Sequence, residues 1–114
     1  MSKPDFEFSN GVVLASASFY TKKYYLNPLF ERLPQKIKQE LQITCVLFTE
    51  EVGGIIVIYF NDDDDISIIT EADENDILYD EIGSGLKIRQ IRNEKRTLLE
   101  QLEQYYKLVI KANN

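Results

Sequence analysis

Two short clusters of carboxylates are the residues in this sequence best suited to chemistry. Thr49-Glu50-Glu51 falls where a helix is expected to end, and Tyr79-Asp80-Glu81 falls just before a glycine-rich segment. Acids near a helix C-terminus oppose the helix dipole, so the first cluster is unfavourable unless it has a purpose. If the two clusters lie close together in the fold, their oxygens could hold a cation. The candidate binding residues are therefore Glu50, Glu51, Tyr79, Asp80 and Glu81; the alternative is that the acids are solvated or paired with Lys87 or Arg89.

Four consecutive aspartates at residues 62–65 raise the same question of cation binding. A calcium loop that starts at Asp63 would have Glu74 at its twelfth position, but Ile68 stands at the sixth, where such loops need glycine. The residues on both sides are β-branched or aromatic, as in strands. Because Asn and Asp accept the positive φ of a tight turn, the sequence favours a hairpin turn over a cation site.

Gly83-Ser84-Gly85, followed by Lys87 and Arg89, is a candidate anion site. Free amides at a helix N-terminus attract phosphate when cations lie nearby. The sequence contains neither a GxGxxG pattern nor a Walker glycine-lysine loop. The two glycines are therefore interpreted as a break or kink in a helix.

Histidine is absent from the sequence. Its absence removes Ser-His-Asp and Cys-His catalysis, HExxH zinc sites and histidine acid–base chemistry within one chain. Cys45 lies on an apolar helical stripe and is interpreted as a core residue rather than a nucleophile. Carboxylate chemistry stays open, but no acid–base pair can be recognised from sequence. We predict no catalytic residue, no metal ligand and no cofactor.

The segments that would position these residues are two hairpins and two helices. Aliphatic and aromatic residues at 12–19 and 23–30 predict a β-hairpin whose second strand ends near Asn27-Pro28. Residues 55–60 and 66–71 predict a second hairpin around the aspartates.

Apolar residues three or four positions apart predict the two helices. The first begins near Pro34, ends at Gly53-Gly54, and has a face made of Ile37, Leu41, Cys45, Phe48 and Val52. The second covers residues 86–111, about 39 Å at 1.5 Å per residue, which is longer than a small sheet needs, so part of it should overhang. Its stripe consists of Ile88, Ile91, Lys95, Leu98, Leu102, Tyr105 and Val109.

The resulting order, ββαββα, predicts an α+β fold with an antiparallel four-stranded sheet, two helices packed on one face and a long C-terminal helix. Residues 1–114 should form a single domain, with residues 1–10 as a candidate disordered segment. Residues 55–60 are apolar on both alternating sets of positions, so the second face of the sheet needs a cover. The candidates are the DFEF segment at residues 5–8 and a second copy of the chain.

Composition and charge restrict the class of protein. The 114 residues are 44% hydrophobic and 28% charged, as in one soluble globular domain. No membrane span or signal peptide is recognisable, and the lone Cys45 suits a reducing compartment, so the expected location is the cytoplasm. The net charge of −6 opposes binding to nucleic acid or anionic membranes. The charge is also uneven, because residues 62–81 contain ten acids without Lys or Arg, whereas residues 87–111 contain seven basic and three acidic residues.

Three stretches, KYYLN, LPQKIKQELQITCVLFTEEVGGI and YDEIGSGLKIRQI, resemble a family of small uncharacterised bacterial proteins classed as a domain of unknown function. The resemblance covers residues 11–110. It implies a stand-alone intracellular domain and supplies no activity, cofactor or site.

Two functions from different classes are compatible with these features. The first is a non-catalytic protein–protein interaction or regulatory module that acts as a homodimer and associates through the second face of the sheet or the C-terminal helix. Its acidic region, residues 62–81, would meet a basic protein partner. The alternative is a small carboxylate-based, metal-dependent enzyme or metal-binding regulator built on Glu50, Glu51, Asp80 and Glu81.

Overall fold

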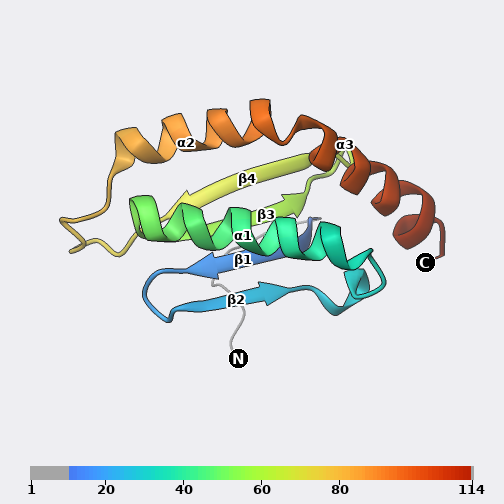
Figure 1. The fold of residues 1–114 in the computed structure, drawn as a ribbon, viewed down its shortest axis with the longest axis horizontal. Helices are drawn as coiled ribbons and strands as arrows, with labels where there is room; N and C mark the ends of the chain where they lie inside the picture. Colours follow the sequence, from blue (N-terminus) through green and yellow to red (C-terminus); the bar gives the residue numbers. More distant parts are fainter. Residues whose placement is uncertain (1–10, 114) are drawn as a thin grey trace.

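The fold, described for residues 11–113 in a computed structural model, is α+β with a four-stranded antiparallel sheet (Figure 1). Strands β1 (Val12–Ser18), β2 (Lys23–Leu26), β3 (Ile55–Phe60) and β4 (Ile66–Glu71) lie in the order β2-β1-β3-β4. Both predicted hairpins are confirmed, and they join through antiparallel pairing of β1 with β3. The DFEF segment, one candidate cover for the sheet, lies outside the described residues.

Helix α1 (Gln35–Val52) has the ends that the sequence predicts. Pro34 precedes the first turn, where its missing N–H is not needed. Gly53 ends the helix with φ +81°, and its N–H donates to the carbonyl of Thr49 at 2.9 Å. Gly54 follows with φ +69°, so the chain turns directly into β3 through two glycines with positive φ.

The C-terminal helix is divided at a different place from the one predicted. Helix α2 (Glu81–Glu94) passes through Gly83-Ser84-Gly85 without a break, and α3 (Arg96–Tyr105) begins after Lys95, whose φ of −105° and ψ of +21° are not helical. The order is therefore ββαββαα. Gly83 serves the start of α2, because its N–H donates to the Asp80 side chain at 2.8 Å and a Cβ at Gly83 would overlap that carboxylate.

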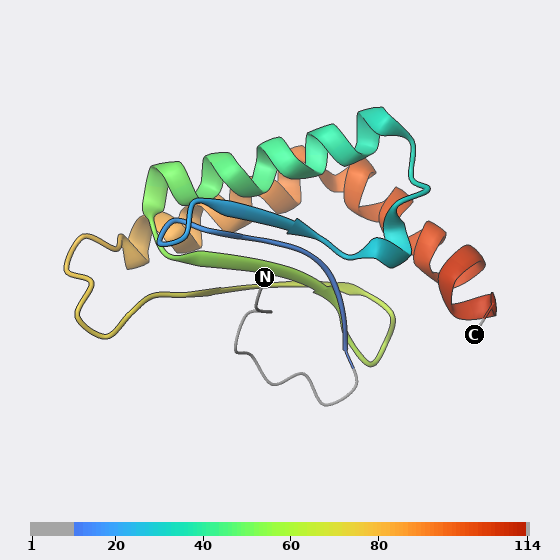
Figure 2. The same cartoon turned by 90° about the horizontal axis from the view of Figure 1, so that it is seen from below.

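The helices form one layer against the sheet. Figure 2 shows α1 and α2 on the same face of the sheet, while α3 and the π-helical turn Tyr106–Ile110 continue past its end. The long C-terminal helical segment therefore overhangs, as expected. Its apolar stripe is buried at Leu98 and Leu102, but Val109 is 40% exposed because it lies in the overhanging part.

The core lies between the two layers. Ile56, Ile58 and Phe60 of β3 are buried and belong to the same apolar cluster as residues of α1, α2 and α3. The ring of Phe60 stacks on Tyr106 with centroids 4.1 Å apart and planes at 6°, and on Phe30 at 5.6 Å. This aromatic stack attaches the end of the sheet to the C-terminal helical segment.

The second face of the sheet is less open than the sequence suggests. Val57 is buried, and Ile55 and Tyr59 are half-buried. The most exposed large apolar side chains among residues 11–113 lie instead on the helices and on the connection before α2. They include Ile43, Leu47, Ile77, Leu78, Ile82, Leu86 and Leu108.

Candidate functional site

The two predicted carboxylate clusters come from segments that meet in the fold. The N–H of Asp80 donates to the carbonyl of Val52 at 3.2 Å, so the end of α1 touches the start of α2. The carboxylates do not converge on one point, however. Glu51 pairs with Lys87 at 2.6 Å, as the ion-paired alternative expects, and Asp80 caps α2. Across residues 11–113, no three Cys, Asp or Glu side chains are grouped so that they could hold a metal.

Of the remaining candidates, Glu50 is exposed on the last turn of α1 and lies outside any shared site. Tyr79 and Glu81 line an acidic cavity of about 750 Å³ between the end of β4, the connection at residues 72–80 and the first turns of α2. The carboxylates in its wall are Glu71, Asp73, Glu74, Asp76 and Glu81. None of them forms a salt bridge within the described part of the chain, and all except Asp76 are exposed. The cavity therefore concentrates negative charge that no neighbouring lysine or arginine neutralises.

Three hydroxyl groups close one side of this cavity. The Tyr79 hydroxyl lies 2.8 Å from Ser84 Oγ and 3.0 Å from Thr70 Oγ1, and the last two atoms are 3.2 Å apart. Ser84 is only 3% exposed, so its hydroxyl depends on these partners. The cluster ties the connection at residues 72–80 to both β4 and α2.

Tyr20, in the turn between β1 and β2, holds the other end of the connection. Its hydroxyl donates to the carboxylate of Asp76 and accepts the N–H of Asp73 at 3.0 Å. Partial burial, together with the hydrogen bond to Asp76, raises the pKa of Tyr20 above its ordinary value. Tyr20 and Tyr79 thus fix the acidic connection at two points, and the carboxylates are held in place rather than left on a free loop.

Removing the Tyr79 hydroxyl should destabilise the protein, whereas removing the Tyr24 hydroxyl should not. Tyr79→Phe is expected to lower the free energy of unfolding by about 1 kcal/mol, because Ser84 loses its shortest hydrogen bond. The Tyr24 hydroxyl is buried and has no hydrogen-bond partner in residues 11–113, so Tyr24→Phe should be neutral or stabilising. Urea unfolding of both variants measures the difference. Equal effects of the two substitutions would contradict the assigned hydrogen bonds.

The four aspartates form the hairpin turn that the sequence favours. The Asn61 side-chain oxygen accepts the N–H groups of Asp63 at 2.9 Å and Asp65 at 3.2 Å, and Asp64 has φ +65°. Lys111 pairs with Asp64 at 2.8 Å. This acidic segment is therefore partly neutralised by the C-terminal helical segment, unlike the acids of the cavity.

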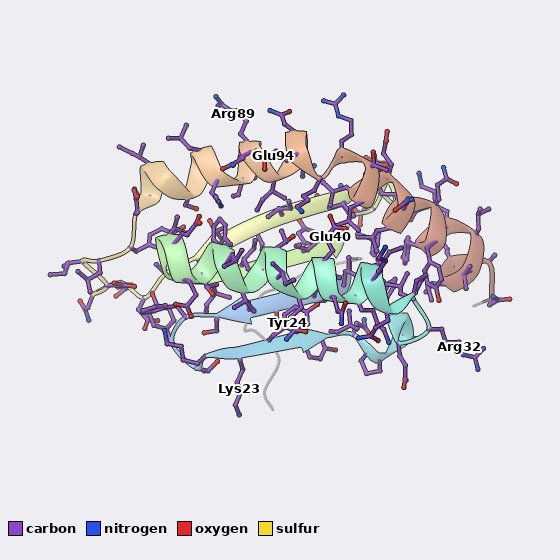
Figure 3. The ribbon with its side chains drawn as sticks, in the orientation of Figure 1. Lys23, Tyr24, Arg32, Glu40, Arg89 and Glu94 are labelled. Carbon is purple, nitrogen blue, oxygen red and sulfur yellow. The ribbon has the colours of Figure 1, made fainter. Side chains whose placement is uncertain are left out.

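The candidate anion site at Gly83-Ser84-Gly85 is already occupied by groups of the chain itself. The Gly83 N–H is used by Asp80, and Lys87 pairs with Glu51. Arg89 points outward from α2, away from the other labelled side chains of α1 and β2 (Figure 3). These residues therefore do not surround a common anion position.

Cys45 is a core residue, as predicted, and its environment gives the protein a pH-dependent stability. Burial raises the pKa of its thiol to about 12, whereas an unfolded cysteine has a pKa of about 8.5. Above about pH 8.5 the unfolded chain loses this proton and the folded chain keeps it. The free energy of unfolding should then fall by about 1 kcal/mol per pH unit.

Urea unfolding between pH 7 and about pH 9.5 measures this slope, because most lysines, with a pKa of about 10.4, keep their charge in that range. The control is Cys45→Ala, which removes the titrating group, so its stability should fall less steeply above about pH 8.5. Parallel profiles for the two proteins would contradict the assignment.

Comparison with known proteins places the chain in a family. A model described as a family of unknown function, DUF6145, matches residues 11–114. The chain belongs to this family. No curated protein and no solved structure matches it. The family description names no activity, so the site is judged on its own geometry. Within residues 11–113, the structure contains no helix of sufficient length and apolarity to span a membrane.

Sequence reasoning selected Tyr79 and Glu81 but missed Glu71, Asp73, Glu74 and Asp76. The available signal was the excess of acids at residues 62–81. That excess does not separate the acids of the cavity from those of the hairpin turn, because residues 72–80 have no helical or strand periodicity from which a common face could be inferred.

Proposed function

We propose that this protein is a non-catalytic interaction module that works as a homodimer in the cytoplasm and offers an acidic surface to a basic protein partner. The observation that carries the proposal is the placement of strongly exposed apolar side chains next to the acidic cavity. Ile77, Leu78 and Ile82 are 94%, 85% and 80% exposed, and they flank Tyr79 and Glu81 of the cavity wall in the sequence.

The exposed apolar side chains beside the acidic cavity indicate that this surface binds another protein rather than catalyses a reaction. Single apolar residues on a surface are ordinary, but several together mark sites of protein contact. A position that is 94% exposed, such as Ile77, gains nothing from the fold of its own chain. Covering such side chains with a partner removes apolar area from water, which supplies the main driving force for association.

The charge around the cavity favours a basic partner. Two of the four aspartates at the β3–β4 turn, Asp64 and Asp65, pair with Lys111 and Lys107 at 2.8 and 3.7 Å, whereas no acid of the cavity forms a salt bridge within residues 11–113. A lysine- or arginine-bearing segment would supply the missing positive charge. The alternative of a metal-dependent enzyme is weaker, because Glu51 and Asp80 are engaged with Lys87 and Gly83.

Size-exclusion chromatography with light scattering tests the homodimer. A mass of twice 13.3 kDa at micromolar concentration is expected. A strict monomer at high micromolar concentration would overturn that half of the proposal.

The cytoplasmic location in the proposal is supported by Cys45, because a lone, fully buried thiol suits a reducing compartment.

Calorimetric titration tests the basic partner. The probes are an amphipathic peptide with lysines on its polar face and the same peptide with glutamates in their place. The lysine peptide should bind, more weakly at high salt, and Glu71→Gln with Glu74→Gln should weaken it at least tenfold. The matched control is Asp62→Asn with Asp63→Asn, at the hairpin turn. Equal binding of the two peptides would overturn the electrostatic part of the proposal.

A further inference from the structure

Residues 81–89 of α2 carry opposite charges at their two ends and exposed apolar side chains between them, and the first of them, Glu81, also lines the acidic cavity. Ile82 and Leu86 are one helical turn apart, so they share a face, and they are 80% and 59% exposed. Glu81 precedes them and Arg89 follows, both exposed and without a salt bridge inside residues 11–113. We call these four residues, Glu81, Ile82, Leu86 and Arg89, the α2 seam.

We infer that a second copy of this chain packs antiparallel on the α2 seam, and this inference rests on the proposed homodimer. When a twofold axis relates two antiparallel helices, a residue that precedes the axis in one helix faces the residue that follows the axis by the same distance in the other helix. In such a pair each Arg89 meets the partner's Glu81, and the Ile82 and Leu86 side chains of both chains pack in the centre. One helix therefore supplies both halves of a complementary interface.

The spacing of the residues allows one axis to satisfy both kinds of contact. Glu81 and Arg89 are eight residues apart, about 12 Å along the helix, and their midpoint is Gly85. The midpoint of Ile82 and Leu86 is Ser84, only one residue away. An axis near these midpoints thus pairs the charges and the apolar side chains at the same time.

Gly85 adds a steric reason for close approach. A glycine inside a helix lowers its stability by about 1 kcal/mol relative to alanine, which is as much as several favourable side-chain pairs contribute. Its presence at position 85 therefore needs an explanation. A Cβ at Gly85 would meet nothing within 4 Å, and no packing inside the chain therefore requires glycine there. Gly85 lies in the cavity wall with Glu81, so the missing side chain leaves room for the Arg89 of the second copy beside Glu81, and the second copy covers that side of the cavity.

The seam has to extend beyond α2 to form a stable dimer. The 14 residues of α2 make a helix about 21 Å long and about 10 Å wide, so the face that it presents covers about 200 Å². Ordinary interfaces bury roughly 800 Å² per partner. Neighbouring apolar side chains supply the remainder. Ile43 and Leu47 are one turn apart on α1, which runs beside α2 in the helical layer (Figure 1), and both are more than half exposed. Ile77 and Leu78, which are exposed and precede α2 in the sequence, extend the apolar surface at the N-terminal end of that helix.

Charge reversal with light scattering tests the seam. Glu81→Lys and Arg89→Glu each reverse one charge in both symmetric contacts, so each variant should dimerise at least tenfold more weakly than the natural protein. Mixing the two variants should restore the dimer, because each chain then brings the charge that its partner lacks. The double variant, Glu81→Lys with Arg89→Glu, should dimerise alone. Circular dichroism checks that every variant is folded.

The matched control for Arg89→Glu is Arg32→Glu, which makes the same change of charge far from Arg89 (Figure 3) and should leave the dimer unchanged. If the natural protein is a dimer and the single variants dimerise as well as it does, another surface forms the dimer; the seam is then wrong and the proposed homodimer survives. If the single variants are monomers and mixing restores nothing, the pairing of Glu81 with Arg89 is wrong. A monomeric natural protein overturns both the seam and the homodimer.

Discussion

Gly54→Ala is expected to lower the free energy of unfolding by about 3 kcal/mol or more, a large part of the stability of a domain of this size. Gly54 has φ +69°, where an alanine is strained. A Cβ there would also lie 2.5 Å from the carbonyl oxygen of Glu71 and 2.7 Å from Cε1 of Tyr79. The first of these atoms belongs to the backbone of β4 and cannot move without disturbing the sheet.

Gly53→Ala is the matched control for this prediction. Gly53 has φ +81° and ψ −167°, a backbone region that other residues rarely adopt, but its Cβ would be 3.9 Å from the nearest atom, in ordinary contact with Tyr79. The control should therefore cost the backbone strain alone, about 1 to 3 kcal/mol, and less than Gly54→Ala. Urea unfolding of both variants at one pH gives the comparison. Equal losses would mean that the close approach of Gly54 to Glu71 and Tyr79 does not limit stability.

The contrast between these two glycines also bears on the acidic cavity. Tyr79, which a side chain at Gly54 would displace, holds Ser84 and Thr70 through its hydroxyl. Gly54→Ala should therefore loosen the connection at residues 72–80 as well as the sheet. Hydrogen exchange in that connection should accelerate more in this variant than in Gly53→Ala.

The sequence predicted the regular elements well because local patterns determine them. The strands at residues 55–60 and 66–71 and the helix that ends at Gly53 were predicted within a residue or two, since alternation, helical spacing and glycine caps are local signals. The break expected at Gly83-Ser84-Gly85 was wrong for one local and one tertiary reason. The Asp80 cap is a local signal that the two glycines outweighed in the prediction. The contact of the buried Ser84 with Thr70 of β4 also favours a helix there, and it depends on the fold.

The candidate site was only half predictable for a similar reason. The sequence identified acids around residues 50–51 and 79–81, and the fold does bring those segments together. Which carboxylates stay free depends on partners far away in sequence, such as Lys87 for Glu51 and Lys111 for Asp64. The apolar surface was predicted on the second face of the sheet or on the C-terminal helix. The most exposed apolar side chains lie on the helices and on the connection before α2, because β3 turns Ile56 and Ile58 toward the helices while Val57 is also buried.

Phe60→Ala should be the most destabilising truncation in the core, with an expected loss of about 3 to 5 kcal/mol. Phe60 is fully buried and stacks on Tyr106 at 4.1 Å and on Phe30 at 5.6 Å. Alanine would leave a cavity between the end of β3 and the π-helical turn Tyr106–Ile110 that the surrounding rings cannot fill by small shifts. The loss should also release the C-terminal helical segment from the sheet, including the pair between Lys111 and Asp64.

Two further variants separate lost packing volume from lost aromatic stacking. Phe60→Leu keeps most of the volume without the ring, and its loss should stay below about 1.5 kcal/mol if filling the space is what matters. Tyr106→Phe keeps the stacked ring and should change stability little. The measurements are urea unfolding for the global stability and hydrogen exchange at residues 106–110 for release of the segment. If Phe60→Leu lost as much stability as Phe60→Ala, the aromatic ring rather than the filled volume would attach the overhanging segment to the sheet. A loss below about 1.5 kcal/mol for Phe60→Ala itself would contradict the role given to Phe60.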